Sequence, residues 1–405
     1  MNSPLSSSGA RGDAICIVGD GVIAKTAALG FAQSGHSVTL LCPDLAARPG
    51  APDAGWDVRV YALNHGARTV LSALKVWDAL DHGRVTPVDA MQVGGDGDRA
   101  GAIGFDAYGA HVGALAWIVE DRNLNQALDA ALRFAHNVTL VRGAAVTLAV
   151  DERRATIGLA DGASIAAALV VGADGAQSWV RGQCDIGLDY RPYHQHAVVA
   201  NFACALPHHG AAHQWFLGAD GIVALLPLAG DRVSLVWSAP DALAERLRAG
   251  SVGELAARVS AVCRAKLGEL TPLEPALVRA FPLRLMRAHA LVGPRVALVG
   301  DAAHVIHPLA GHGMNLGFAD VAELVATVNA REPQRDLGEA RVLARYARAR
   351  AEDVLLMQLA TDGLARLFGA DLEPLRVIRN FGLNLLDRMP ILKRRLISHA
   401  LGKPG

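Results

Sequence analysis

The sequence predicts an α/β protein in which a Rossmann-like nucleotide-binding domain holds an inserted sheet-rich domain and is followed by a helical C-terminal segment. Three observations support this fold class. An apolar run, a glycine turn and an alanine-rich helix follow one another near the N-terminus; short strand-like runs dominate residues 190–240; and helical spacing prevails after residue 317. The 405 residues suffice for two domains, because single cores rarely grow beyond about 250–300 residues.

Composition argues against several classes of protein. The formal net charge is zero, which gives no global electrostatic case for nucleic-acid binding. The five cysteines show no CxxC spacing, which argues against a structural zinc site and a disulfide framework. The longest apolar runs, such as residues 165–173, are too short for a membrane-spanning helix of about 20 residues. Residues 1–12 are polar and lack the apolar core of a signal peptide, so we expect a disordered lead-in and a cytoplasmic protein.

The first element, residues 14–41, has the pattern of a β-α-β unit. Its Gly19, Gly21 and Ala24 fit the G-x-G-x-x-G/A fingerprint of a dinucleotide-binding turn. The first glycine makes the tight turn, the second lets the backbone approach a pyrophosphate, and the third small residue lets the helix pack on the strand. Cys42 occupies the usual place of an acid that binds ribose, and Asp44 follows two residues later. Either Asp44 substitutes, or that hydrogen bond is absent.

A second match to the same fingerprint, at residues 95–100, has a different context. Gly101 and another strand-like run follow it, so no helix opens there. We expect a hairpin loop at this point.

The next stretch alternates between helix and strand patterns. Residues 119–134 have an acidic first turn and helical apolar spacing. Strand-like runs follow at residues 138–141, 145–150 and 155–165, the last with an Asp-Gly turn.

An apolar run then ends at Asp174-Gly175, with Ser178 and Arg181 on the following helical turn. Its form alone allows a plain strand-to-helix turn capped by the aspartate, or a turn that contributes to a binding site.

The sheet-rich part spans residues 190–240 and is interrupted by a polar helix at about 241–267. Residues 295–304 then predict a buried parallel strand that returns to the first domain. Within this segment the strand gives way to a turn at Gly300-Asp301, and the Asp301 carboxylate would suit a sugar-like polyol. Gly311 and Gly313 follow at the start of a helix, where bare backbone N–H groups would attract negative charge.

Two further features have competing interpretations. Five histidines lie close together in sequence, but no acid or cysteine shares their segments at ligand spacing, so we expect no metal site; they are His194, His196, His208, His209 and His213. Seven basic residues follow residue 375, interleaved with apolar positions at helical spacing. They predict either a helix pair with a solvated basic face, or a surface that contacts a membrane or a biosynthetic complex.

Six segments together resemble the single-component FAD-dependent aromatic hydroxylases with the para-hydroxybenzoate hydroxylase-like fold, most closely the branch that hydroxylates the ring of ubiquinone precursors. These segments, spread over nearly the whole chain, are IVGDGVIA (17–24), DVRVYALN (57–64), WIVEDRNLNQAL (117–128), GADGAQSWVR (172–181), FPLRL (281–285) and GDAAHVIHPLAGHGMNLGFADV (300–321). The combination is far more specific than any one segment.

The resemblance implies a role for particular residues. Gly19, Gly21 and Ala24 would serve the FAD pyrophosphate, and Arg59 and Arg122 would approach the cofactor. Asp174 and Gly175 match a motif for FAD and, indirectly, for NAD(P)H, and Asp301 matches the aspartate that binds the ribityl chain. The segment lining the isoalloxazine ring would comprise Pro308, Gly311, Gly313, Met314 and Asn315. Pro308 would shape the reaction pocket, and His312, which stands where this branch commonly has glutamine, is a candidate modulator of catalysis.

The resemblance also implies a domain plan. Residues 13–75, 100–185 and 285–330 would form the FAD-binding domain, residues 76–99 and 186–284 the substrate domain, and residues 331–405 the helical C-terminal segment.

The implied reaction is hydroxylation of an electron-rich, polyprenylated phenol with FAD, NAD(P)H and O₂, through a flavin hydroperoxide. Two alternatives stay open: a flavin epoxidase or reductase acting on an isoprenoid lipid, and a non-catalytic flavin-binding scaffold in which Cys42 and His312 are signs of decay. The expected location is the cytoplasm or the inner face of a membrane. The oligomeric state does not follow from the sequence.

Overall fold

The computed structural model describes residues 14–43, 55–94, 102–273, 277–307 and 312–369. Its nucleotide-binding half is built on a six-stranded sheet in the order β19-β20-β12-β1-β2-β8. The strands from β20 to β8 run parallel, and β19 is an antiparallel edge. Their bounds are β1 (Ala14–Val18), β2 (Ser37–Cys42), β8 (Val138–Arg142), β12 (Leu169–Gly172), β19 (Val292–Gly293) and β20 (Val296–Leu298). The predicted β-α-β unit and the returning strand are confirmed.

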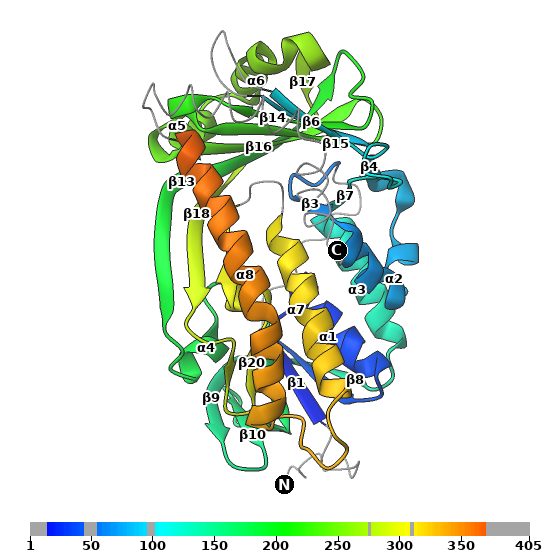
Figure 1. Cartoon of the computed structure of the whole chain (residues 1–405), viewed down its shortest axis with the longest axis vertical. Coiled ribbons are helices and arrows are strands. Elements are labelled where there is room, and N and C mark those ends of the chain that lie inside the picture. Colours follow the sequence, from blue (N-terminus) through cyan, green and yellow to red (C-terminus); the bar gives the residue numbers. More distant parts are fainter. Residues whose placement is uncertain (1–13, 44–54, 95–101, 274–276, 308–311, 370–405) are drawn as a thin grey trace.

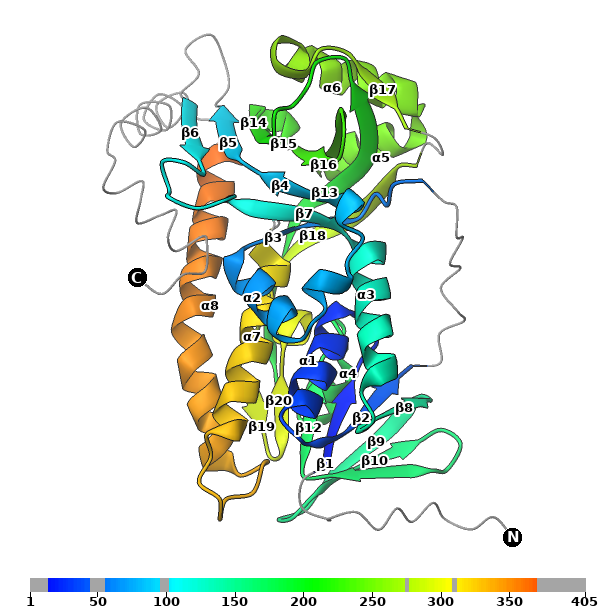
Figure 2. The same cartoon turned by 90° about the vertical axis from the view of Figure 1, so that its right-hand side faces the viewer.

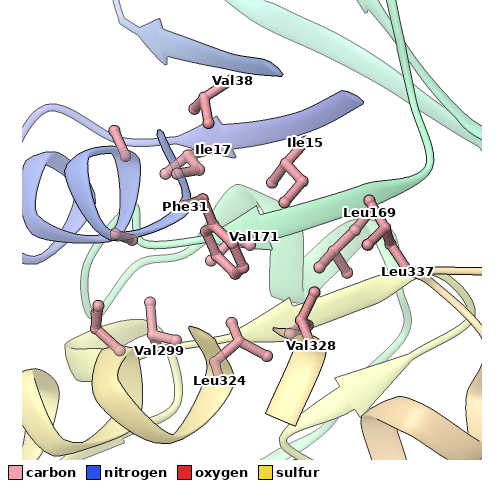
Figure 3. Packing of buried hydrophobic residues seen from close by; sticks show 14 of the residues in the cluster. Ile15, Ile17, Phe31, Val38, Leu169, Val171, Val299, Leu324, Val328 and Leu337 are labelled. Atoms are coloured by element: carbon pink, nitrogen blue, oxygen red, sulfur yellow. The ribbon is translucent and has the colours of Figure 1, made fainter. Parts of the chain in front are cut away.

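Both faces of this sheet are buried, because successive side chains of a strand point to opposite sides. Ile15 and Ile17 face helices α1 (Val22–Gln33), α7 (His312–Asn329) and α8 (Ala340–Gly369), and pack with residues such as Phe31 and Leu324 (Figure 3). Cys16 faces the other way, into a second core shared with β9 (Ala145–Val150), β10 (Ala155–Leu159) and β11 (Ser164–Ala167). The last three strands form a small antiparallel sheet of their own.

The second half is a nine-stranded sheet ordered β21-β18-β13-β16-β15-β14-β5-β6, with β17 paired to β13. The bounds are β5 (Ala90–Gly94), β6 (Ala102–Asp106), β13 (Leu188–Cys204), β14 (Ala211–Phe216), β15 (Ile222–Leu228), β16 (Arg232–Pro240), β17 (Leu270–Pro272), β18 (Arg279–Ala288) and β21 (His304–Val305). Helices α5 (Asp241–Ala249) and α6 (Val252–Leu267) cover one face of this sheet. The sheet-rich second unit is therefore confirmed.

One helix that the sequence predicts over about 241–267 is two helices. Ser251 begins α6 with a capping box, in which its hydroxyl accepts from the Glu254 N–H and the Glu254 carboxylate accepts from the Ser251 N–H. Gly250 lies at the break between the helices. The cap satisfies donors that a continuous helix would have paired internally.

The strands beside the second fingerprint match form a hairpin, because β5 pairs antiparallel with β6. Residues 95–100 themselves lie outside the described residues. The pairing places β6 in the nine-stranded sheet, although the sequence assigned residues from 100 onward to the FAD-binding domain. Hydrogen bonds to β5 hold the strand there, and a domain boundary taken from a family resemblance does not reveal this pairing.

Smaller elements fill the space between the two halves. Figure 2 shows a three-stranded sheet of β3 (Val60–Leu63), β7 (Ala116–Glu120) and β4 (Val85–Val88) between the large sheet and the helices α2 (His65–Ala73) and α3 (Asp121–Phe134). The remaining short helices are α4 (Trp179–Gln183), η1 (Trp77–Ala79), η2 (His82–Arg84), η3 (Gly218–Asp220) and η4 (Gly300–Ala302).

The long helix α8 spans the molecule from the nucleotide-binding sheet to the large sheet (Figure 1). Near its end, Asp362 pairs with Arg191 and accepts from the Tyr193 hydroxyl at 3.2 Å, and both partners lie on β13. No helix in the described part of the chain is long and apolar enough to cross a membrane.

Candidate active site

The turn between β1 and α1 has the geometry that a dinucleotide requires. Gly19 has a φ of +139°, and a Cβ there would lie 2.3 Å from the Ala173 carbonyl oxygen. Gly21 begins α1, and a Cβ at this position would meet no described atom within 4 Å. Within this fully described helix, no side chain caps the start and no acid lies in the first turn. The first backbone N–H groups of such a helix have no side-chain cap and no nearby negative charge, so they can bind a phosphate group.

Two neighbours complete the turn. Ala24 is fully buried, and its methyl group would lie 3.2 Å from a Cβ on Gly19. The helix therefore packs closely on the turn, and both positions need small residues. The Cys42 sulfur lies 3.8 Å from the Gly19 carbonyl oxygen, and burial raises the pKa of its thiol. Cys42 is therefore a neutral group at the place where an acid was expected. Asp44 lies outside the described residues.

Asp301 lies in the turn that follows β20, away from the Gly19 turn in sequence. Its side chain is exposed to solvent, yet the surrounding protein raises the pKa of the carboxyl by desolvation. His304, Arg59 and Arg284 oppose this shift through their charges. A carboxylate that is accessible and yet surrounded by protein can receive a polar ligand.

Arg59 and Arg284 act on Asp301 from different parts of the fold. Arg59 precedes β3, and its guanidinium carbon lies 5.6 Å from the centre of the Tyr61 ring and 5.9 Å from that of Phe281. Phe281 and Arg284 belong to β18 of the large sheet. Opposite charges from the two halves of the protein, on Asp301 and on Arg284, therefore lie near each other.

Arg122 takes a position next to this group rather than in it. Its backbone N–H donates to Asp57 at 3.2 Å, and its guanidinium donates to the Gly55 carbonyl. Asp57 also accepts from the Arg59 N–H at 3.0 Å. Asp57 thus holds the backbone of both predicted arginines. It lies in the family segment 57–64, but no motif spacing singled out this residue.

The two carboxylate oxygens of Asp174 have different surroundings, which bear on whether this turn is a helix cap or part of a binding site. One carboxylate oxygen accepts from the Val180 N–H at 3.0 Å and so caps α4. The other oxygen is buried and has no partner among the described atoms. Gly175 follows with a φ of +82°. A cap needs only one oxygen, so the second is available to a ligand.

Arg181 links this turn to the Asp301 turn. Its guanidinium donates to the Ala302 carbonyl at 2.8 Å and to the Ala176 carbonyl at 2.9 Å. Ser178, as predicted, lies at the start of the same helix and caps it. The two aspartate turns are therefore held at a fixed separation.

The start of α7 closes the site. Asn315 donates to the Ala62 carbonyl at 2.9 Å and accepts from the Asn64 N–H at 3.0 Å. Gly313 and Met314 lie in the preceding turn and are half-buried. Pro308 and Gly311 lie outside the described residues, and His312 is described only as the first residue of α7.

The clustered histidines do not all lie together. His194 and His196 both approach Asp241, at 3.9 and 3.0 Å. His208 contacts the Leu228 and Gly230 carbonyls, and His213 stacks on Trp215. Among the described residues, no three metal-ligating side chains form a group.

The residues present fit an FAD molecule. The cradle at Gly19 and Gly21 suits the pyrophosphate. The Asp174 oxygen that has no partner among the described atoms, and the exposed residue Asp301, suit hydroxyl groups. Arg59 and Arg284, whose charges act on Asp301, suit negative charge.

Known proteins support this fit. A family model described as FAD binding domain matches residues 125–355. The chain is 37% identical over 390 residues to 3-demethoxyubiquinol 3-hydroxylase of Escherichia coli (strain K12), covering 96% of this chain and 98% of that protein. It is 35% identical over 401 residues to the ubiquinone hydroxylase UbiL of Rhodospirillum rubrum, covering 98% and 92%. The chain belongs to this family of FAD-dependent hydroxylases.

Solved structures agree on the fold of the family. PqsL of Pseudomonas aeruginosa, a probable FAD-dependent monooxygenase, superposes with a TM-score of 0.74 at 23% identity, covering 91% of this chain and 99% of that one. HpxO of Klebsiella pneumoniae, solved with FAD and uric acid, gives 0.73 at 18% identity, covering 97% of each. The sequence relatives make the chain an FAD-dependent monooxygenase, and these solved structures show the fold that its sequence predicts.

Proposed function

We propose that this hydroxylase adds one oxygen atom to the ring of an electron-rich, polyprenylated phenol, using NAD(P)H and O₂. The observation that carries the proposal is the meeting of Asp301, from the nucleotide-binding half, with the charges of Arg59 and of Arg284 on the large sheet. Relatives named as ubiquinone hydroxylases, which align over nearly the whole chain, support the substrate class. A ubiquinone precursor is the corresponding substrate here.

When bound, the flavin supplies the oxygen-transfer chemistry. The chain's own residues hold and orient it. The Gly19 turn and the start of α1 would bind the pyrophosphate, and Asp301 would accept from the ribityl hydroxyls. Asn315 fixes the start of α7 against β3. Arg59 and Arg284 supply positive charge near Asp301. Phe281, which is exposed on β18, gives the substrate side an aromatic surface.

Product analysis tests the proposal. The purified holoenzyme is incubated with NAD(P)H, O₂ and a panel of prenylated and soluble phenols, and the products are analysed by mass spectrometry. We expect one added oxygen on the ring of a prenylated phenol. Oxygen added to the isoprenoid chain would indicate an epoxidase, and added hydrogens alone would indicate a reductase. No product from any phenol would refute the hydroxylase proposal.

The nicotinamide donor is tested separately. Anaerobic stopped-flow reduction with NADH and with NADPH, each with and without the phenol, measures which donor reduces the flavin. A flavin that neither donor reduces would exclude NAD(P)H as the reductant.

We also propose that the protein works at the inner face of a membrane through its basic C-terminal residues. A polyprenylated substrate resides in lipid, and seven lysines and arginines lie between residues 376 and 403. Flotation of the full chain with anionic vesicles should fall when Lys393, Arg394 and Arg395 are replaced by glutamate. Equal flotation of both proteins would refute the membrane contact.

A further inference from the structure

A charged cluster is buried directly behind the Asp301 turn. Asp320 of α7, His304 and Arg350 of α8 are exposed by only 0%, 2% and 4%. The Asp320 carboxylate accepts from the His304 Nε2 at 2.7 Å and from the Arg350 Nε at 2.8 Å. Charges rarely occupy such positions without a partner, because desolvation is costly.

Asp320 also reaches the backbone of the cofactor turn. The carboxylate oxygen that accepts from His304 accepts from the Gly300 N–H at 2.9 Å as well. Gly300 has a φ of +59°, and a Cβ there would lie 3.3 Å from Ile23. Ile23 is packed more closely still against Gly317, where a Cβ would lie 2.8 Å from the Ile23 side chain. Gly300 is thus held by packing on one side and by Asp320 on the other.

The rest of the turn is fixed by its own contacts. The Ala303 N–H donates to the Gly300 carbonyl at 2.9 Å, and the Ala302 carbonyl accepts from Arg181. Asp301 lies between these anchored residues and is itself exposed. The backbone that carries the Asp301 carboxylate is therefore held by Asp320, by Arg181 and by the hydrogen bond within the turn.

We propose that Asp320 is a positioning residue for FAD: by holding the Gly300 N–H, it fixes the turn that presents Asp301 to the ribityl chain. Arg350 neutralises Asp320 from α8, and its guanidinium extends to the more exposed Asp353 at 2.8 Å. The proposal rests on FAD binding by this site and is independent of the substrate.

The test separates the Gly300 contact from the packing of α7 against α8. Two double variants both carry Arg350→Met, which removes the facing cation: one adds Asp320→Asn and the other adds Asp320→Leu. The amide can still accept from the Gly300 N–H, whereas leucine has a similar volume and no acceptor. Affinity for FAD is measured by titrating each apoprotein and following flavin fluorescence.

The leucine double variant should bind FAD about tenfold more weakly than the amide double variant, the usual effect of one lost hydrogen bond. Visible circular dichroism of the bound flavin should also change in the leucine variant only. Equal affinities and identical spectra would overturn the proposal, even if both variants melt at a lower temperature than the natural protein.

A second measurement applies if the leucine variant does not fold. An asparagine at position 320 has one acceptor oxygen in place of two. If this oxygen accepts from the Gly300 N–H, the amide nitrogen faces the Arg350 guanidinium, so Asp320→Asn alone cannot keep both contacts. We expect weaker FAD binding and an altered flavin spectrum for Asp320→Asn, and neither change for Asp353→Asn at the exposed end of the cluster. A lower melting temperature with unchanged FAD affinity and spectrum would show a purely structural role and refute the proposal.

Discussion

Gly19 and Gly21, two residues apart, are needed for different reasons. Gly19 combines a positive φ with a close approach to the Ala173 carbonyl, so its requirement comes from the fold. Gly21 has open space around the missing Cβ, so its requirement comes from the ligand. The structure separates two roles that one sequence fingerprint merges.

Replacing Gly19 by alanine should destabilise the apoprotein by at least about 2 kcal/mol, because the added methyl strains the backbone and contacts Ala173. Chemical denaturation without FAD measures this. Gly21→Ala is the matched control: its apoprotein stability should stay within about 0.5 kcal/mol, while its affinity for FAD falls about tenfold. Equal losses of stability in both variants would contradict the distinction.

His213 should make the protein sensitive to acid. Burial, with smaller effects from Lys266 and His208, lowers its pKa to about 4. Between about pH 6.5 and pH 4 the unfolded chain therefore binds a proton that the native state does not, and stability is lost as the pH falls through this window. The loss from pH 7 to pH 4.5 should be about 2–3 kcal/mol from this residue.

The variant His213→Phe, which keeps a ring beside Trp215, isolates this effect. Denaturation of both proteins at pH 7 and pH 4.5 should show a smaller loss in the variant, since His307, whose pKa is also lowered to about 4, acts equally in both. The same pH dependence in both proteins would contradict the assignment.

His312 is the remaining prediction at this scale. The variant His312→Gln restores the residue common in the resembling branch, and it should bind FAD yet change the rate of flavin reduction or the yield of product per NAD(P)H. Stopped-flow reduction and product quantification measure both. Unchanged values would remove His312 from the mechanism.

Which site residues the sequence reveals depends on how local their role is. Gly19, Asp174 and Asp301 lie within three residues of the ends of β1, β12 and β20, so strand-to-turn patterns identify them. Asp320 and Arg284 act on turns distant in sequence, from a helix and from the other sheet. No spacing rule predicts such contacts, although both residues lie in or next to the family segments.

At the scale of elements, α6 shows a boundary that local chemistry did contain. Gly250, Ser251 and Glu254 form a helix stop and a capping box, yet continuous polar spacing favoured one long helix. Strand β8 is the opposite case. Its sequence predicts a strand shortly before β9 along the chain and does not indicate a partner. In the structure β8 pairs in parallel with β2, which lies nearly a hundred residues earlier. Only the three-dimensional fold decides that partner.

The cap can be tested without disturbing the flavin site. Ser251→Ala should lower the free energy of unfolding by about 1 kcal/mol, because the hydroxyl no longer accepts from the Glu254 N–H. Denaturant titration measures the loss, and the FAD affinity should not change. A change in FAD affinity would mean that α6 is coupled to the cofactor site.

At the scale of the whole molecule, the cofactor should stabilise the protein because both halves line its site. Excess FAD at a thousand times its dissociation constant should add about 4 kcal/mol. Arg59→Gln should reduce this gain, since its guanidinium lies beside Asp301 and Phe281 from the two halves.

The melting temperatures of the Arg59→Gln apoprotein and of the natural apoprotein should be similar, because the Arg59 side chain is exposed when no ligand is present. Thermal melts with and without FAD measure both quantities. A full gain in the variant would show that Arg59 does not contact the cofactor.

The order of strands in the nucleotide-binding sheet has a consequence for synthesis. Strand β20 lies beside β12 in the sheet, but the chain reaches it only after every strand of the large sheet except β21 has been made. The Asp301 turn follows β20, and Asp320 and Arg350 come later still. On the ribosome, where folding proceeds from the N-terminus, the pyrophosphate cradle is therefore available early and the ribityl site is completed near the end. A nascent chain cannot hold FAD at both ends until α8 has emerged.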